Sequence, residues 1–237
     1  MGAAHRSLRS LQIDIVACRL CPRLVRWREQ VARQKVKRFA DQEYWGKPIP
    51  GFGDPHARLL LVGLAPAAHG GNRTGRMFTG DESGNWLFRA LYRAGFANQP
   101  TSTNRLDGLR LADCYITAAL RCVPPQNAPL AREIDRCRPF LLDELNLLRS
   151  VRVVIGLGRI GFQNVLGAYR EMGRIQYRKK PFFAHGAMYR FDNLTVIASY
   201  HPSQQNTFTG KLTEKMFDRV FTQARQCMRT ATYSTES

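Results

Sequence analysis

The sequence predicts an α/β protein, a three-layer α/β/α sandwich around a central four-stranded parallel sheet. Four short runs are almost wholly apolar, as is typical of strands covered on both faces. They lie at residues 59–62, 114–120, 151–157 and 194–200. Segments with the apolar spacing of helices separate these runs, and this alternation favours parallel strands joined by crossover helices.

We expect the 237 residues to form one domain with three parts. Residues 1–57 form an N-terminal extension of helices and loops, residues 58–229 the α/β core, and residues 230–237 a frayed tail. Trp45 and Phe52 belong to a Pro- and Gly-rich loop that ends the extension. We expect these rings to pack the extension against the sheet. The alternative is that they stack on nucleic-acid bases.

The expected helices follow the order of the strands. Two helices share residues 8–34, on either side of a Cys-x-x-Cys pair, and further helices are expected at 86–96, 131–148, 158–166 and 212–229. Ser83 is a candidate N-cap for the first helix of the core. Residues 98–110 are expected to be a polar connection, and residues 169–190 a basic, irregular one.

The net charge of the chain indicates the class of its binding partners. It has 36 Lys and Arg against 18 Asp and Glu, a formal net charge of +18. Such an excess predicts a polyanionic partner, although a generally basic surface would give the same composition. We find neither an apolar run of about 18 residues nor the apolar segment of a signal peptide. We therefore expect a cytoplasmic protein that does not engage a membrane.

The six cysteines are expected to be reduced thiols or metal ligands, because disulfides are rare in such a compartment. A Cys-x-x-Cys pair presents two thiolates to one metal site, and two further cysteines across a Pro-Pro turn complete a set of four. The set is Cys18, Cys21, Cys122 and Cys137. Zinc, an iron-sulfur cluster and ordinary buried thiols all remain open. Cys114 and Cys227 are expected to be core residues.

The glycine-rich loop that follows the first core strand is the expected binding site. Ligands of open α/β sheets bind beyond the carboxyl ends of the strands, and glycines let the backbone approach a ligand closely. The loop contains the carboxylate of Asp81 and the ring of Phe78, which could stack on a flat ligand. It has neither a Gly-Lys-Ser/Thr phosphate loop nor a GxGxxG dinucleotide motif.

Two other strand exits carry polar side chains toward the same edge. Asn127 follows the second strand, and its amide offers both a donor and an acceptor, which suits the edge of a pyrimidine. The alternative is an ordinary turn residue. His201 follows the fourth strand, directly before Pro202. We expect Asp81, Asn127 and His201 to converge.

Two segments at these exits resemble the signature motifs of uracil-DNA glycosylases. They are GLAPAAHGGNRTGRMFTGDESG and HPSQQNTFTG. The resemblance is to the iron-sulfur type, and Leu64 favours type B (family 5) over family 4, in which an acidic residue follows the first glycine. It extends from about Cys18 to the final helix and implies that the four cysteines hold a 4Fe-4S cluster.

The resemblance also implies a monofunctional glycosylase of base excision repair, which flips out uracil and hydrolyses its N-glycosidic bond. Asp81 would activate a water, and His201 would donate a hydrogen bond to the departing uracil. The base would lie against Phe78, with Asn127 and the backbone of Gly63, Leu64 and Ala65 reading its edge. The loop that would grip the DNA consists of Ser203, Gln204, Gln205 and Asn206.

This chain departs from its relatives in two places. Thr117-Ala118-Ala119 replaces a segment in which several branches place a uracil-reading Asn, and Leu64 removes a polar group. A pocket with fewer paired hydrogen bonds rejects wrong bases weakly, so we expect activity on other deaminated bases such as hypoxanthine. We expect a monomer acting on damaged DNA. The alternative function is that of a protein with a structural metal site that binds damaged or single-stranded DNA without cutting it.

Overall fold

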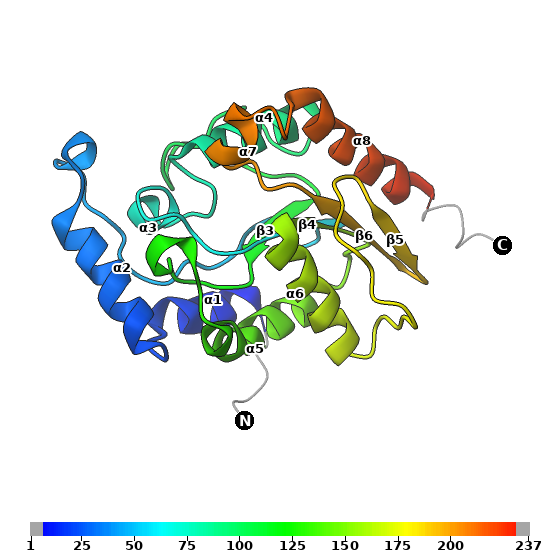
Figure 1. The fold of residues 1–237 in the computed structure, drawn as a ribbon, viewed down its shortest axis with the longest axis horizontal. Helices are drawn as coiled ribbons and strands as arrows, with labels where there is room; N and C mark the ends of the chain where they lie inside the picture. Colours follow the sequence, from blue (N-terminus) through cyan, green and yellow to red (C-terminus); the bar gives the residue numbers. More distant parts are fainter. Residues whose placement is uncertain (1–6, 231–237) are drawn as a thin grey trace.

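The computed structural model describes residues 7–230 and contains a three-layer α/β/α sandwich (Figure 1). Its sheet has six strands in the order β1-β3-β2-β4-β6-β5. The four middle strands are parallel to one another. They are β3 (Cys114–Ala118), β2 (Leu59–Gly63), β4 (Val153–Leu157) and β6 (Leu194–Ser199). The predicted parallel core is therefore confirmed.

The sheet extends beyond the four predicted strands, because an antiparallel strand that the sequence did not predict lies at each edge. β1 (Phe52–Gly53) pairs with β3, and β5 (Met188–Phe191) pairs with β6. Both lie in segments that we expected to be loops. β1 has only two residues, and β5 is partly exposed along its length, so neither forms the continuous apolar run that identified the inner strands.

The central strands are buried because each contributes side chains to both faces of the sheet. Leu59 and Leu61 point into one apolar core, whereas Leu60 and Val62 point into the other. This alternation is the two-residue period of a strand. Helices α4 (Glu82–Arg93) and α8 (Glu214–Thr230) cover the first core, and α5 (Ala131–Leu147) and α6 (Gly158–Glu171) cover the second (Figure 1).

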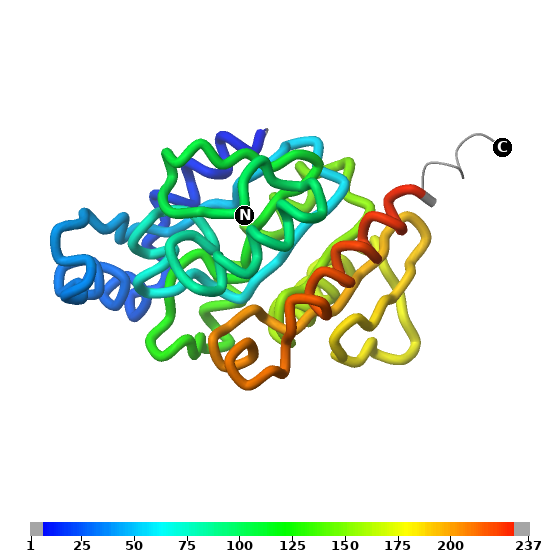
Figure 2. Tube along the Cα trace, turned by 90° about the horizontal axis from the view of Figure 1, so that it is seen from above, coloured from blue at the N-terminus to red at the C-terminus, as the bar shows by residue number. Residues whose placement is uncertain are grey.

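The N-terminal extension forms α1 (Leu8–Ala17), which packs on α5, and α2 (Pro22–Gln34). Both views place this extension at the opposite end of the molecule from the β5–β6 hairpin (Figures 1 and 2). Short helical turns occupy the connections. They are η1 (Lys37–Phe39), α3 (Gly71–Thr74), η2 (Pro125–Asn127) and α7 (Gln204–Phe208).

Several smaller predictions can be compared with the structure. Trp45 and Phe52 pack against the first core, and Cys114 and Cys227 are buried, as expected. The expected frayed tail lies almost wholly outside the described residues. Between residues 7 and 230, no helix combines the length and the apolar character needed to cross a bilayer.

Candidate active site

The loop after β2 brings Phe78 back over the end of its own strand. A Cβ atom at Gly63 would lie 3.0 Å from the Phe78 ring, so glycine is needed for this close approach. Phe78 itself has φ of +52°, a left-handed conformation that is uncommon outside glycine. This strained turn presents an aromatic ring where β2 ends.

Asp81 ends the loop and begins α4. Its Oδ1 accepts a hydrogen bond of 2.9 Å from the backbone N–H of Gly84, so Asp81 is the N-cap of α4. The prediction of Ser83 as the cap is wrong, because Asp is an equally good cap and the helix begins two residues earlier than Ser83 would allow. Burial raises the pKa of Asp81, and the Gly84 hydrogen bond and the charge of Arg73 oppose that rise.

His201 lies at the exit of β6, beside Phe78. Their ring centroids are 5.7 Å apart and the planes are tilted by 31°. The amide of Asn206 donates a 2.8 Å hydrogen bond to the His201 carbonyl oxygen, which fixes the backbone at this turn. Burial lowers the pKa of His201 to about 4, so the imidazole is neutral at neutral pH.

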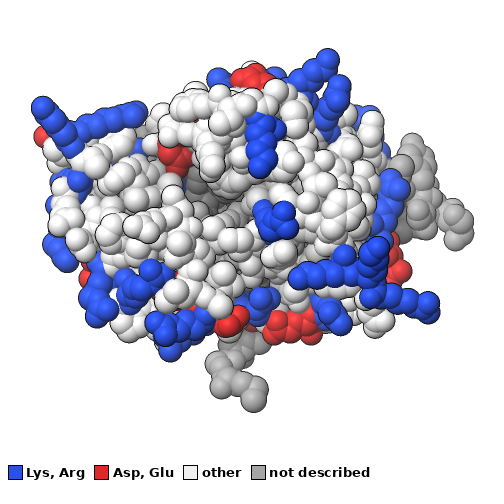
Figure 3. Space-filling view, viewed as in Figure 1, with Lys and Arg blue, Asp and Glu red and all other residues white. Residues whose placement is uncertain are grey.

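One cavity of about 850 Å³ joins three of the strand exits. Asp81 comes from the loop after β2, Asn127 from the turn after β3, and Gln204 from the segment after β6. The predicted convergence of Asp81, Asn127 and His201 is thus present for Asp81 and Asn127 in this cavity, and Gln204 takes the third place. Phe78 and His201 are not among the residues that line this cavity and instead contact each other. Figure 3 shows the hollowed face and the many Lys and Arg side chains around it.

A set of contacts that the sequence did not indicate fixes the loop that ends at Asp81. Arg73 donates hydrogen bonds to the carbonyl oxygens of Gly80 at 2.8 Å and His69 at 2.7 Å, and to Gln42 Oε1 at 2.5 Å. Its guanidinium lies 3.8 Å from the centroid of the Phe39 ring. Arg73, whose guanidinium packs against the Phe39 ring of η1, therefore holds the backbone beside Asp81.

The four candidate metal-ligating cysteines come together. Cys18, Cys21, Cys122 and Cys137 line one small cavity, whose apolar walls include Leu24, Leu120 and Phe140. Between residues 7 and 230, no three His, Cys, Asp or Glu side chains converge tightly enough for a single metal ion. A cubane cluster places each cysteine on a different iron and so needs a wider arrangement.

Hydrogen bonds to sulfur also suit this cavity to thiolate ligands. Arg28 Nη1 lies 3.0 Å from Cys122 Sγ, and the backbone N–H of Arg121 donates to Cys137 Sγ at 3.4 Å. Burial raises the pKa of Cys122 to about 11 and that of Cys137 to about 12. A bound metal is therefore needed to hold these groups as thiolates at neutral pH, and the donors present fit an iron-sulfur cluster.

A buried ion pair lies beneath the β3 exit, and sequence reasoning missed it. Arg121 Nη2 is 2.6 Å from Glu144 Oε2, and the two side chains are 2% and 0% exposed. Thr117 hydrogen-bonds to both partners, and its hydroxyl lies 2.5 Å from Glu144 Oε2. Thr117 therefore faces α5 and does not line the cavity that contains Asp81.

Comparisons with known proteins agree with this geometry. Residues 50–225 match the model of the uracil DNA glycosylase superfamily. A type-5 uracil-DNA glycosylase of Mycobacterium leprae is 48% identical over 222 residues, 93% of this chain and 95% of the relative. That of Thermus thermophilus is 48% identical over 213 residues, 90% of this chain and 94% of the relative.

The similarity extends to archaea. The type-5 uracil-DNA glycosylase of Pyrobaculum aerophilum is 43% identical over 210 residues, which are 89% of this chain and 88% of the relative. A type-4 uracil-DNA glycosylase of the same organism is 32% identical over only half of this chain. The chain belongs to the uracil-DNA glycosylase superfamily. The resemblance to the type-5 branch, which rested on Leu64 and the two signature segments, is confirmed.

Proposed function

We propose that this protein is the uracil-excising glycosylase of a base excision repair pathway, and that the cavity joining Asp81, Asn127 and Gln204 receives the flipped nucleotide. A stacked base hides its glycosidic bond, so the nucleotide must leave the duplex before it can be cut. The observation that carries the proposal is that three separate strand exits supply polar side chains to one cavity, in a chain of this superfamily.

Base reading is assigned to Asn127 on the cavity wall and to residues 63–65 and Phe78, none of which lines the cavity. Asn127 has φ of +56° and its exposed side chain lines the cavity, which suits it to pair with a pyrimidine edge. The carbonyls of Gly63 and Leu64 accept hydrogen bonds from Ala119 and Leu120, which fixes the 63–65 backbone between β2 and β3. Backbone groups of Gly63, Leu64 and Ala65 and the Phe78 ring complete the proposed base-binding set.

Asp81 is assigned as the group that activates water. The water oxygen forms a bond to C1′ while the N1–C1′ bond breaks, its electron pair leaves with uracil, and Asp81 accepts the proton of the water. An ionised carboxylate also favours the positive charge that develops on the sugar. His201 is neutral and donates a hydrogen bond to uracil O2, where negative charge accumulates.

The segment after β6 is assigned to the DNA. Gln204 and Gln205 are exposed on α7, and Ser203 precedes them, so these three can contact the backbone. Asn206 already bonds to the His201 carbonyl, so it positions the histidine in addition to any DNA contact. Phe208, at the end of α7, is 76% exposed. This ring is the apolar group that can fill the vacated stack.

Replacing Phe208 by Ala is expected to lower kcat/KM for uracil in duplex DNA by about tenfold, because base–aromatic stacking contributes about 1–3 kcal/mol. The loss should be much smaller on a single-stranded substrate, because flipping a base out of a single strand leaves no gap in a duplex base stack for the Phe208 ring to fill. The equally exposed Phe182, 69% accessible on the β5 side, provides a control as Phe182→Ala. Equal losses in the two variants, or equal losses on the two substrates, would contradict the assignment.

The base specificity is proposed to extend beyond uracil. Thr117 hydrogen-bonds to Glu144 and so offers no polar group to a base. With a panel of duplexes containing uracil, hypoxanthine, xanthine or normal bases, we expect rapid release of uracil and slower release of hypoxanthine. Strict turnover of uracil alone would contradict this proposal.

We also propose that the four cysteines bind a 4Fe-4S cluster. Four iron–thiolate bonds would tie the start of α2 to the β3 exit and to α5, and hydrolysis of a glycosidic bond requires no electron transfer. The role assigned here is structural. We further propose that the protein acts as a monomer.

Replacing Cys18 by Ala is expected to reduce soluble yield, iron content and absorbance near 400 nm together, because the cluster ties the extension to the core. Cys227→Ala removes a buried thiol of α8 that lies outside the four-cysteine cavity, and it should keep its iron. A colourless Cys18→Ala protein with wild-type stability would refute the structural role.

A further inference from the structure

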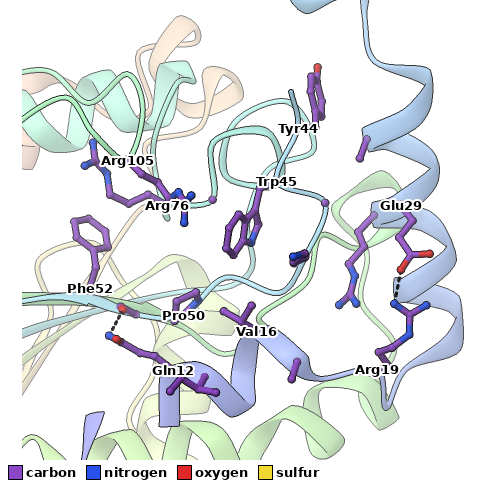
Figure 4. A pocket seen from close by; sticks show the side chains of 18 of the residues that line it. Gln12, Val16, Arg19, Glu29, Tyr44, Trp45, Pro50, Phe52, Arg76 and Arg105 are labelled. Carbon is purple, nitrogen blue, oxygen red and sulfur yellow. Dashed lines mark hydrogen bonds and ion pairs between the residues drawn. The ribbon is translucent and has the colours of Figure 1, made fainter. Parts of the chain in front are cut away.

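A second cavity, larger than the catalytic one, lies between the N-terminal extension and the edge of the sheet. Its volume is about 1150 Å³, and α1, α2, the segment before β1 and the 105–109 loop surround it (Figure 4). It shares no lining residue with the catalytic cavity. The proposed glycosylase chemistry makes no use of it.

The lining of this cavity carries a large excess of positive charge. Its Lys and Arg side chains are Arg9, Arg19, Arg28, Arg33, Lys47, Arg76 and Arg105. Glu29 is the only acidic residue of the lining, and it pairs with Arg19 at 2.6 Å. Arg76 is neutralised from outside by Asp107, also at 2.6 Å. Within residues 7–230, no ion pair to a carboxylate is found for the other five cations, so the cavity suits an anion.

One of these cations has an unused donor in the interior. Arg28 is 2% exposed, and its two terminal nitrogens donate to Cys122 Sγ and to the Cys18 carbonyl oxygen. Its Nε is buried and has no partner among the described residues. A buried donor without an acceptor is costly, so the Arg28 guanidinium adds an incompletely satisfied positive group to the wall of the cavity.

The cavity also has an apolar and aromatic floor. Trp45 stands in the middle of Figure 4, with Pro50 near it and Phe52 farther to the left, and all three line the cavity. Trp45 is held by a 3.1 Å hydrogen bond from its Nε1 to the Pro48 carbonyl oxygen, and Arg105 lies 4.1 Å from its ring centroid. Cations around aromatic rings are typical of grooves that bind single-stranded nucleic acid. The volume exceeds the usual 300–1,000 Å³ of small-ligand pockets.

The two cavities are neighbours. Tyr44 lines the second cavity and His69 lines the catalytic one, and the Tyr44 hydroxyl lies 3.1 Å from His69 Nδ1. The backbone N–H of Trp45 also donates a hydrogen bond to the carbonyl oxygen of Arg73. Arg73 is the residue that holds the backbone beside Asp81. A ligand in the second cavity would thus contact the segment that supports the catalytic loop.

We propose that this second cavity binds a single-stranded segment of DNA, with phosphates on Arg33, Lys47 and Arg105 and bases against Trp45. The inference rests on the proposed function, because it assigns a second contact to the same DNA. A strand held here would keep the enzyme on its substrate.

The test uses the full chain and a fluorescein-labelled, undamaged oligonucleotide of about eight thymidines, measured by anisotropy over a range of salt. The variant is the double neutralisation Arg33→Gln/Lys47→Gln. Both side chains are exposed, so folding is preserved. Loss of two phosphate contacts should reduce the slope of log K against log salt by about 1.4, at about 0.7 per contact. Arg149→Gln/Arg190→Gln removes the same charge from exposed sites outside both cavities and should leave the slope unchanged.

Equal slopes in the two double variants would overturn the proposal. So would binding of thymidine monophosphate as tight as that of the oligonucleotide, because the site would then recognise a free nucleotide. Uracil release by the wild type is measured in parallel. A failure of the wild type to release uracil would defeat the proposed function but not the binding site.

Discussion

Replacing Asp81 by Asn is expected to lower the single-turnover rate of uracil excision by about 1000-fold, because Asn cannot accept a proton from the attacking water. Stability should hardly change. Asp81 Oδ1 caps α4 through the N–H of Gly84, and an Asn side chain offers an oxygen in the same position. Single-turnover rates and urea unfolding of both proteins check the two expectations.

The pH profile separates the two roles of Asp81. Burial raises its pKa, so the wild-type rate should climb with pH through a limb that lies above the usual range of an Asp carboxyl. Asp81→Asn should lack this limb. His201, whose lowered pKa is about 4, binds fewer protons folded than unfolded between pH 4 and its ordinary value. Stability therefore falls as pH drops through that window, and each rate needs an unfolding control at the same pH.

Asp81→Ala provides a matched comparison, since it removes both the proton acceptor and the cap. It should lose the same rate as Asp81→Asn and, in addition, about 1 kcal/mol of unfolding free energy. A slow Asp81→Ala paired with an active Asp81→Asn would mean that the carboxylate only supports the helix, and the proposed mechanism would be wrong.

Replacing Glu144 by Leu is expected to destabilise the protein by about 3–5 kcal/mol, because it leaves the Arg121 guanidinium buried without a carboxylate. The pair is 2.6 Å apart and almost inaccessible to water. Thr117 and Tyr115 also hydrogen-bond to Glu144, so their hydroxyls lose partners too. Denaturant unfolding of the wild type and the variant gives the difference.

The double variant Arg121→Met/Glu144→Leu is the control. Removing both charges replaces an ion pair by apolar side chains of similar length, so most of the lost stability should return. Arg121 also donates its backbone N–H to Cys137, and that bond survives either substitution. If Glu144→Leu unfolds within about 1 kcal/mol of the wild type, the pair does not support the β3 exit as described.

The elements that the sequence predicted are those whose signal is local. β2 and β4 are fully buried, so every residue in them is apolar or glycine and the run is visible without a partner. β1 forms only because Phe52 pairs with Ile116 of β3, a residue far along the chain. A strand of two residues is too short to show the alternation of apolar and polar residues that identifies a strand in the sequence. The helix cap was misplaced for a similar reason, since Asp81 and Ser83 are both good caps and only the turn of the chain selects one.

The candidate site shows the same division. Asp81, Asn127 and His201 were predicted to converge because the carboxyl ends of parallel strands meet, and two of them, Asp81 and Asn127, line one cavity, whereas His201 does not. The Arg121–Glu144 pair joins residues 23 positions apart, and Arg73 and Gln42 are 31 apart. Nothing local in the sequence marks these pairings. The exposure of Phe208 was not predicted, because it depends on where α7 ends. The end of such a short helix depends on its packing and not on a local sequence pattern.

The central claim is that the cavity cuts a glycosidic bond and does not merely hold damaged DNA. The most direct measurement is the release of free uracil from a uracil-containing duplex, followed by alkali treatment of the strand. We predict free uracil in an amount equal to the abasic sites, with the strand intact until alkali is added. A duplex that is bound and shifted but keeps its uracil would contradict the account and favour a non-catalytic binder of damaged DNA.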